Sequence, residues 1–240
     1  MFENIIKNVH NRHPLIHCIT NYVSINDCAN IVLACGGAPI MAEDINEVSQ
    51  ITSICQGLDI NIGMLNDNKL SSMLKAGATA NELGIPVILD PVGAGSSDYR
   101  IKAVQNLMSN VQFGVIRGNV SEIKAIAAKQ GIHNISAGVY DTMQKDKSAM
   151  GVEAGIADKI TDDNIKEMAD FINKLSQKTG AVIAVTGRID MVADENRVYA
   201  IRNGHKMMSL VTGAGCQLSA LTSAYVAADK EHILESVCAA

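Results

Sequence analysis

The chain has 240 residues, 48% of them hydrophobic and only 3% aromatic, so we expect a core of aliphatic side chains and methionine. Its formal net charge of −5 is spread without a basic stripe or polybasic run, so we expect neither nucleic acid nor a membrane surface as a partner. No apolar run reaches the length of about 18 residues that a membrane helix needs, and the six cysteines lack disulfide or zinc spacing, which favours reduced thiols in a cytoplasmic protein.

Apolar segments that resemble buried strands alternate along the chain with segments of helical periodicity. In chain order we expect a helix at 2–12, a strand at 14–20, a helix at 24–35 with Ser24 as its N-cap, a strand at 38–41, a helix ending at 56, a strand at 58–63, a helix at 67–83, a strand at 86–90, a helix at 98–109, a strand at 113–119, a helix at 121–130, a helix at 163–179 and a strand at 181–187. Residues 190–193 and 197–201 flank a polar turn and predict a β-hairpin.

This alternation predicts an α/β fold in three layers, with a mostly parallel sheet, helices on both faces and the late hairpin at one edge. No linker, repeat or low-complexity tract divides the chain, so we expect residues 1–240 to form a single domain. Residues 131–160 are the least periodic part, and we expect them to be partly mobile. The chain ends within an expected helix, which predicts either a longer native protein or a short last helix.

A glycine turn, Thr212-Gly213-Ala214-Gly215-Cys216, leads from an extended segment into a helix with apolar residues at 218, 221 and 225. Backbone N–H groups at a helix N-terminus have no partner within the helix and attract anions, most often phosphate. The motif is short, however, and by itself it fits a tight turn before a packed helix equally well.

Polar side chains stand at the ends of several expected strands, where ligands bind in open parallel sheets. These residues are Asp90, Arg117, Asn119 and Thr186, with Glu122 one turn into the next helix. Each has a purely structural alternative: a terminating turn for Asp90 and Thr186, a surface ion pair for Arg117, and a capping box for the other two. Two carboxylates, an arginine and an anion site on one rim together predict a site for a nucleotide with Mg²⁺.

Two other chemistries find little support. Gly93-Ala94-Gly95 lacks the third glycine of a dinucleotide-binding turn, because position 98 is aspartate. None of the six histidines is paired with a serine or cysteine nucleophile at a recognisable spacing, so nucleophilic hydrolysis is not indicated.

Six motifs occur in the same order as in a known family, from about residue 10 to residue 228. They are Cys18-Ile19-Thr20-Asn21-Tyr22-Val23, Ala38-Pro39-Ile40-Met41, Leu89-Asp90-Pro91-Val92-Gly93-Ala94, Arg117-Gly118-Asn119-x-x-Glu122, Val185-Thr186-Gly187 and Thr212-Gly213-Ala214-Gly215-Cys216. The chain thereby resembles the hydroxyethylthiazole kinases, which belong to the ribokinase-like superfamily. The resemblance implies transfer of phosphate from ATP, with Mg²⁺, to the primary alcohol of 4-methyl-5-(2-hydroxyethyl)thiazole in thiamine salvage. It also implies a homotrimer with the thiazole site at the subunit boundary.

The resemblance also implies roles for individual residues. Thiazole contacts would come from Asn21, Val23 and Met41, with Gly213 near the hydroxyl; ATP contacts from Arg117 and Thr186; and Mg²⁺ contacts, mainly through water, from Asp90 and Glu122. The N–H groups of Gly213, Ala214, Gly215 and Cys216 would receive charge that develops on the transferring phosphoryl group. Cys216 stands where the wider superfamily carries an aspartate base, and we expect the helix N-terminus to lower the pKa of its thiol.

Two departures from the family pattern and several alternatives remain at this point. The stretch 133–150 is longer than the family's usual link, and the chain ends short of the family's last helices. A hydroxymethylpyrimidine kinase would carry aspartate in place of Cys216, and a related repair enzyme would lack the contacts of Asn21 and Met41. A regulatory module that binds a nucleotide without turnover is a further alternative, and Met41 by itself fits a core-filling role.

Overall fold

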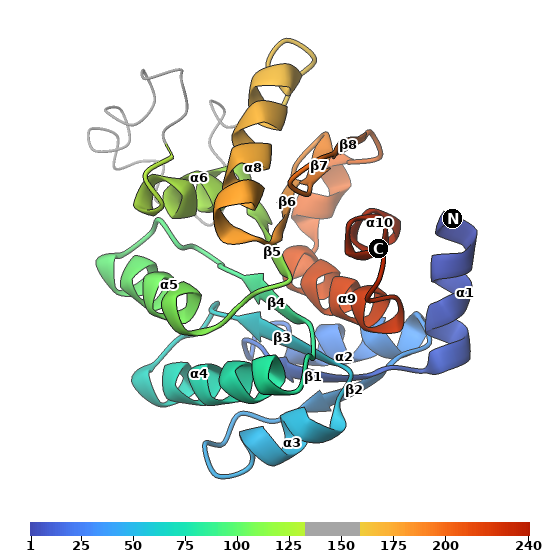
Figure 1. Ribbon diagram of the computed structural model, residues 1–240, viewed down its shortest axis with the longest axis vertical. Coiled ribbons are helices and arrows are strands. Elements are labelled where there is room, and N and C mark those ends of the chain that lie inside the picture. Colours follow the sequence, from blue (N-terminus) through green and yellow to red (C-terminus); the bar gives the residue numbers. More distant parts are fainter. Residues whose placement is uncertain (133–158) are drawn as a thin grey trace.

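The computed structural model describes residues 1–132 and 159–240, whose strands form one eight-stranded sheet (Figure 1). The strands are β1 (Leu15–Ile19), β2 (Ala38–Met41), β3 (Gly57–Asn61), β4 (Val87–Asp90), β5 (Val115–Asn119), β6 (Val182–Thr186), β7 (Asp190–Ala193) and β8 (Val198–Ile201). Their order is β2-β1-β3-β4-β5-β6-β7-β8, parallel from β2 through β6 and antiparallel over β7 and β8. The predicted mostly parallel sheet with a late hairpin at one edge is therefore confirmed.

Helices cover both faces of the sheet, as predicted (Figure 1). They are α1 (Phe2–Arg12), α2 (Ile25–Ala34), α3 (Val48–Ile54), α4 (Asp67–Glu82), α5 (Asp98–Asn110), α6 (Val120–Lys129), α8 (Ile165–Thr179), α9 (Ala214–Ala228) and α10 (Ile233–Ala239), with a short 3₁₀ helix, η3, at Lys206–Leu210. α1, α2, α9 and α10 lie on one face, whereas α4, α5, α6 and α8 lie on the other. No helix among the described residues is long and apolar enough to cross a membrane.

Two expectations about local structure need correction, and a third concerns residues that the structure does not describe. α3 ends at Ile54 rather than at position 56, because the Gln56 N–H already donates to Leu15 O at the start of β1. Ser24 precedes α2 as predicted, but its side chain makes no capping hydrogen bond there. Most of the segment expected to be mobile, residues 133–158, lies outside the described residues.

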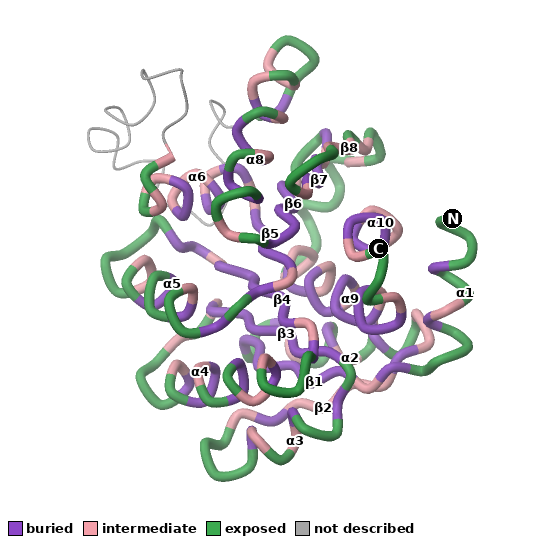
Figure 2. The backbone as a smooth tube through the Cα atoms, in the orientation of Figure 1, coloured by how far each residue is buried: buried purple, intermediate pink, exposed green. Residues whose placement is uncertain are grey.

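The central strands are buried almost throughout their length beneath the covering helices (Figure 2). On the α9 face, a Cβ added at Gly57 would lie 3.1 Å from Ala227 Cβ and 3.2 Å from Ser223 O. Small residues thus let α9 pack directly on β3. This close packing sets the first turn of α9 beside the carboxyl ends of the parallel strands, where the polar residues predicted from the sequence gather.

Candidate active site

A chain of buried polar side chains connects β1, β3, β4 and α9. Asn21 Nδ2 donates to Cys216 Sγ and to Asn61 Oδ1, each at 3.1 Å. Asn61 Nδ2 donates to Asp90 Oδ2 at 2.7 Å, and Ser219 Oγ donates to the same oxygen at 2.9 Å. The thiol of the glycine turn and the carboxylate at the end of β4 are therefore held in one hydrogen-bonded network.

Arg117 extends this network toward β6 and the glycine turn. Its Nη1 lies 3.6 Å from Asp90 Oδ2, and its Nη2 donates to Thr186 Oγ1 at 2.9 Å. The residue is only 7% exposed, so the alternative of a surface ion pair does not hold. A Cβ added at Gly215 would lie 2.9 Å from Nη1, so glycine there lets the backbone of the turn approach the guanidinium closely.

Glu122 both caps α6 and ties it to the loop after β4. Its N–H donates to Asn119 Oδ1 at 2.9 Å, while its Oε2 accepts the Asn119 N–H at 2.8 Å, which is the predicted capping box. Its Oε1 accepts the Gly93 N–H at 2.8 Å. Burial, with a smaller contribution from the Asp90 charge, raises the pKa of Glu122 to about 7 despite these hydrogen bonds.

Two buried carboxylates carry oxygens without a hydrogen-bond partner among the described residues. They are Asp90 Oδ1 and both oxygens of Asp59, which lies two residues before Asn61 on β3. Burial raises the pKa of both groups, that of Asp59 well above its usual range. For Asp90, the charge of Arg117 and the hydrogen bonds from Ser219 and Asn61 act in the opposite direction.

The glycine turn has the backbone conformation that only glycine adopts readily. Gly213 has φ of +72°, and a Cβ there would lie 2.5 Å from Ser24 Cβ. The Ala214 N–H donates to Val211 O at 3.2 Å, which removes it from the predicted anion-binding donors. The N–H groups of Gly215 and Cys216 have no acceptor among residues 1–132 and 159–240.

The expectation of a lowered thiol pKa at Cys216 is wrong. Burial, and next the negative charge of Asp90, raise the pKa of this thiol above its ordinary value. Hydrogen bonds from Ser24, Asn61 and Asn21 act in the opposite direction without reversing the shift. The residue is 8% exposed, so loss of hydration outweighs the attraction of the helix N-terminus.

The predicted thiazole contacts differ in their surroundings. Asn21 is buried within the network, whereas Val23 is 63% exposed and stands outside it. Met41 ends β2, pairs in register with Cys18 and packs against the apolar cluster that contains Cys216. Met41 therefore has the packing that its core-filling alternative requires, while lying beside the site.

Sequence reasoning missed three members of the network: Asn61, Ser219 and Ser24. Asn61 ends β3, so the rule of polar strand ends that selected Asp90 would also have found it. Ser24 Oγ donates to Asn21 Oδ1 at 3.2 Å. Ser219 carried no signal, because its contact with Asp90 depends on how α9 packs on the sheet. Ser24 lies only three residues after Asn21, so its contact is local, but the sequence indicated only an N-cap role for it.

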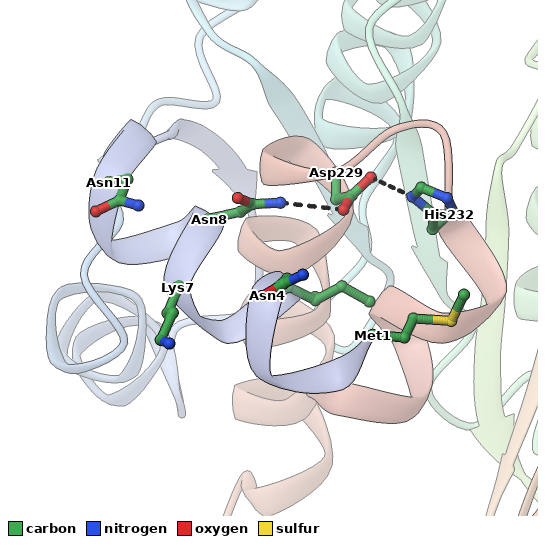
Figure 3. Close-up of a pocket in the computed structure, with 8 residues that line it drawn as sticks. Met1, Asn4, Lys7, Asn8, Asn11, Asp229 and His232 are labelled. Atoms are coloured by element: carbon green, nitrogen blue, oxygen red, sulfur yellow. Dashed lines mark hydrogen bonds and ion pairs between the residues drawn. The ribbon is translucent and has the colours of Figure 1, made fainter.

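A hollow lies far from this network, between α1 and the turn after α9 (Figure 3). Asp229 at its centre accepts a hydrogen bond from Asn8 at 3.1 Å and pairs with His232 at 2.9 Å. Asp229 follows the last residue of α9, so about 20 Å of helix separates it from Cys216. Asn8 and His232 thus satisfy the Asp229 carboxylate, and we assign the hollow no part in the chemistry.

The sheet order and the helices that cover both faces are those of the ribokinase-like fold. A ribokinase-like superfamily protein from Enterococcus faecalis shares the fold with a TM-score of 0.57 at 11% identity, over 98% of this chain and 76% of that one. The model of the hydroxyethylthiazole kinase family matches residues 6–162 and 149–240. The chain belongs to the hydroxyethylthiazole kinase family.

Individual relatives agree with this assignment. A hydroxyethylthiazole kinase of Clostridium acetobutylicum is 51% identical over 243 aligned residues, which span 100% of this chain and 83% of the relative. The solved structure of a hydroxyethylthiazole kinase from Pyrococcus horikoshii superposes with a TM-score of 0.82 at 32% identity. That match covers 99% of this chain and 80% of the other.

Proposed function

We propose that this protein transfers the γ-phosphoryl group of ATP to the primary alcohol of 4-methyl-5-(2-hydroxyethyl)thiazole, as in thiamine salvage. The observation that carries the proposal is the buried network in which Asn21 joins Cys216 to Asp90 through Asn61. It puts the segment expected to bind the thiazole and the carboxylate expected near the phosphates within one connected structure. Family membership supports the same assignment.

Arg117 and the glycine turn are the proposed contacts for ATP phosphates. The guanidinium is always charged, and it lies against Gly215 at the N-terminus of α9, where backbone N–H groups favour anions. Thr186, which already accepts a hydrogen bond from Arg117 Nη2, is proposed to contact ATP beside it. Phosphoryl transfer depends mainly on positioning and charge stabilisation, and these groups supply both.

The carboxylates fit a bound Mg²⁺ that keeps most of its waters. Asp90 Oδ1 is buried without a hydrogen-bond partner among the described residues, and Glu122 lies close enough for the charge of Asp90 to raise its pKa. No group of three His, Cys, Asp or Glu side chains among the described residues could hold a metal by itself, and Mg²⁺ commonly uses one or two carboxylates with substrate phosphates. When bound, the ion would neutralise charge on the phosphates.

The proposed place of the alcohol is between Gly213 and the thiol of Cys216. Burial and Asp90 raise the pKa of that thiol, so it is protonated at neutral pH. It therefore orients the hydroxyl rather than removing its proton at the outset. This is sufficient because the alcohol becomes acidic only late in a loose transition state.

We also propose a homotrimer in the cytoplasm, with the substrate site at the subunit boundary. Large apolar side chains are exposed on η3 and the residue after it: Met207 by 62%, Met208 by 58%, Leu210 by 80% and Val211 by 51%. Gly213 packs against Ser24, so this segment adjoins the exposed Val23. A monomeric mass in light scattering after gel filtration would contradict the trimer.

The proposed substrate is tested by offering two alcohols to the purified protein with ATP and Mg²⁺. We expect ADP to form with the thiazole alcohol and at most slowly with hydroxymethylpyrimidine. A preference for hydroxymethylpyrimidine would replace the proposal with the related kinase activity. Absence of ADP with either alcohol, although ATP binds, would favour a nucleotide-binding module without turnover.

A further inference from the structure

Lys69 is a buried lysine whose ammonium group is shared among three segments at the edge of the proposed site. Its side chain is 2% exposed, and Nζ lies 2.7 Å from Glu43 Oε2. The same nitrogen donates to the Thr20 carbonyl at 2.8 Å and lies 4.3 Å from the centre of the Tyr22 ring. Tyr22 in turn donates its hydroxyl to Glu43 Oε1. We name these four residues the Lys69 cluster.

The Lys69 cluster joins the segments that carry the proposed thiazole contacts. Thr20 directly precedes Asn21, whose amide donates to Cys216 Sγ, and Tyr22 lies between Asn21 and Val23. Glu43 follows the end of β2 by two residues, close to Met41. The lysine comes from the first turn of α4, so one ammonium group ties the ends of β1 and β2 to a rigid helix.

Stability alone does not account for a lysine at this position. Burying an ammonium group is costly, and its attraction to a partner often fails to offset that cost. The partner here is 37% exposed, which weakens the attraction further. The helix dipole also disfavours a cation in the first turn of α4. What the lysine does provide is geometry, because it fixes a backbone carbonyl, a carboxylate and a ring at once.

We propose that Lys69 is a positioning residue for the alcohol substrate: it holds residues 20–23 so that Asn21 and Val23 meet the thiazole. The inference rests on the proposed function, since it names the half of the site that binds the alcohol. No residue of the Lys69 cluster contacts Arg117, Thr186 or Gly215 directly. The groups proposed to bind ATP are joined to residues 20–23 only indirectly, from Asn21 through Asn61 and Asp90, so we expect them to depend on the cluster less. The two substrates should therefore respond differently to its loss.

The test is Lys69→Met, which keeps the apolar stem in its buried place and removes the charge. We expect the KM for the thiazole alcohol to rise by about tenfold to a hundredfold, the range for loss of a hydrogen bond to a charged group. The KM for ATP should change less than about twofold, because no residue of the Lys69 cluster contacts the groups proposed to bind ATP. Equal changes in both KM values, or an unchanged KM for the alcohol, would overturn the proposal.

The matched control is Lys75→Met, on the same helix. Lys75 Nζ also donates to a backbone carbonyl, that of Ile45 at 2.8 Å, but it does not touch residues 20–23. We expect it to leave both KM values unchanged. Should Lys69→Met fail to fold, Glu43→Gln gives the same test from the half-exposed side of the cluster, with the same two outcomes.

A second readout separates this proposal from the proposed function. Hydrogen–deuterium exchange of a peptide covering residues 20–24 should be faster in Lys69→Met than in the native protein, with exchange in the core strands unchanged. That result requires no turnover, so it holds even if the native protein leaves the thiazole alcohol unphosphorylated. Unchanged exchange over residues 20–24 would refute the positioning role whatever the substrate is.

Discussion

We expect Gly213→Ala to lower the free energy of unfolding for two separate reasons, both of which arise from the added Cβ. Gly213 has φ of +72°, and the added Cβ would lie 2.5 Å from Ser24 Cβ. The left-handed backbone costs a residue with a side chain about 1 kcal/mol. Overlap in a packed site costs about 1–3 kcal/mol more, so we expect a total loss of about 2–4 kcal/mol in the free energy of unfolding.

Gly84→Ala is the matched control. Gly84 has φ of +63°, but nothing lies within 4 Å of the position that an added Cβ would take. It carries the backbone cost alone, about 1 kcal/mol. Urea unfolding followed by circular dichroism measures both variants, and the difference between them isolates the overlap with Ser24. Equal losses in the two variants would refute the steric argument.

Gly213→Ala should also lower the catalytic activity. The Ser24 N–H and hydroxyl both bond to Asn21 Oδ1 at 3.2 Å, so moving Ser24 also moves Asn21 away from Cys216. We expect kcat/KM for the alcohol to fall about a hundredfold in Gly213→Ala, since displacements of about 1 Å have effects of that size. Gly84→Ala should keep the native value. A native kcat/KM in a folded Gly213→Ala protein would contradict the proposed arrangement.

Three further predictions concern Glu122, Cys216 and Met41. The pKa of Glu122 is about 7, above its ordinary value of 4.5, so the folded protein holds this proton more tightly than the unfolded chain. Without divalent cations, this group's contribution to stability is present below pH 4.5 and falls by about 3 kcal/mol as pH rises to 7; Glu122→Gln should flatten the urea-derived curve, and parallel curves would exclude this origin. Cys216→Ala should keep measurable turnover and Cys216→Asp should work at least as well as the native residue, because residue 216 is proposed only to orient the alcohol. Loss of all ADP formation in both variants, with ATP binding intact, would instead indicate an obligatory thiolate. Met41→Ala should raise the KM for the thiazole alcohol, and an unchanged KM would leave Met41 as a packing residue.

Much of the fold was predictable because buried parallel strands form short apolar runs of their own. Val87–Asp90 begins one residue later than the expected strand, and Val182–Thr186 is one residue shorter than expected at each end. The order of the strands was not predictable in this way. It depends on contacts such as that between Gly57 and Ala227, which are far apart in the sequence and have no local signature.

The residues of the candidate site were likewise predictable only where the sequence carries a local signal. Asp90 and Thr186 were found because each ends a strand. Arg117 was expected at a strand end but lies in the middle of β5, from where its side chain reaches both residues. The bond from Ser219 to Asp90 spans 129 positions and could not be read from spacing. The shift at Cys216 was predicted with the wrong sign because position on a helix was visible in the sequence, whereas depth of burial was not.

The most direct test of the central proposal is mass spectrometry of the product formed by the purified protein with ATP, Mg²⁺ and 4-methyl-5-(2-hydroxyethyl)thiazole. We predict a thiazole product heavier by one phosphoryl group, in amounts equal to the ADP released. ADP without a phosphorylated thiazole, or no reaction from protein that is folded and binds ATP, would contradict the proposed function.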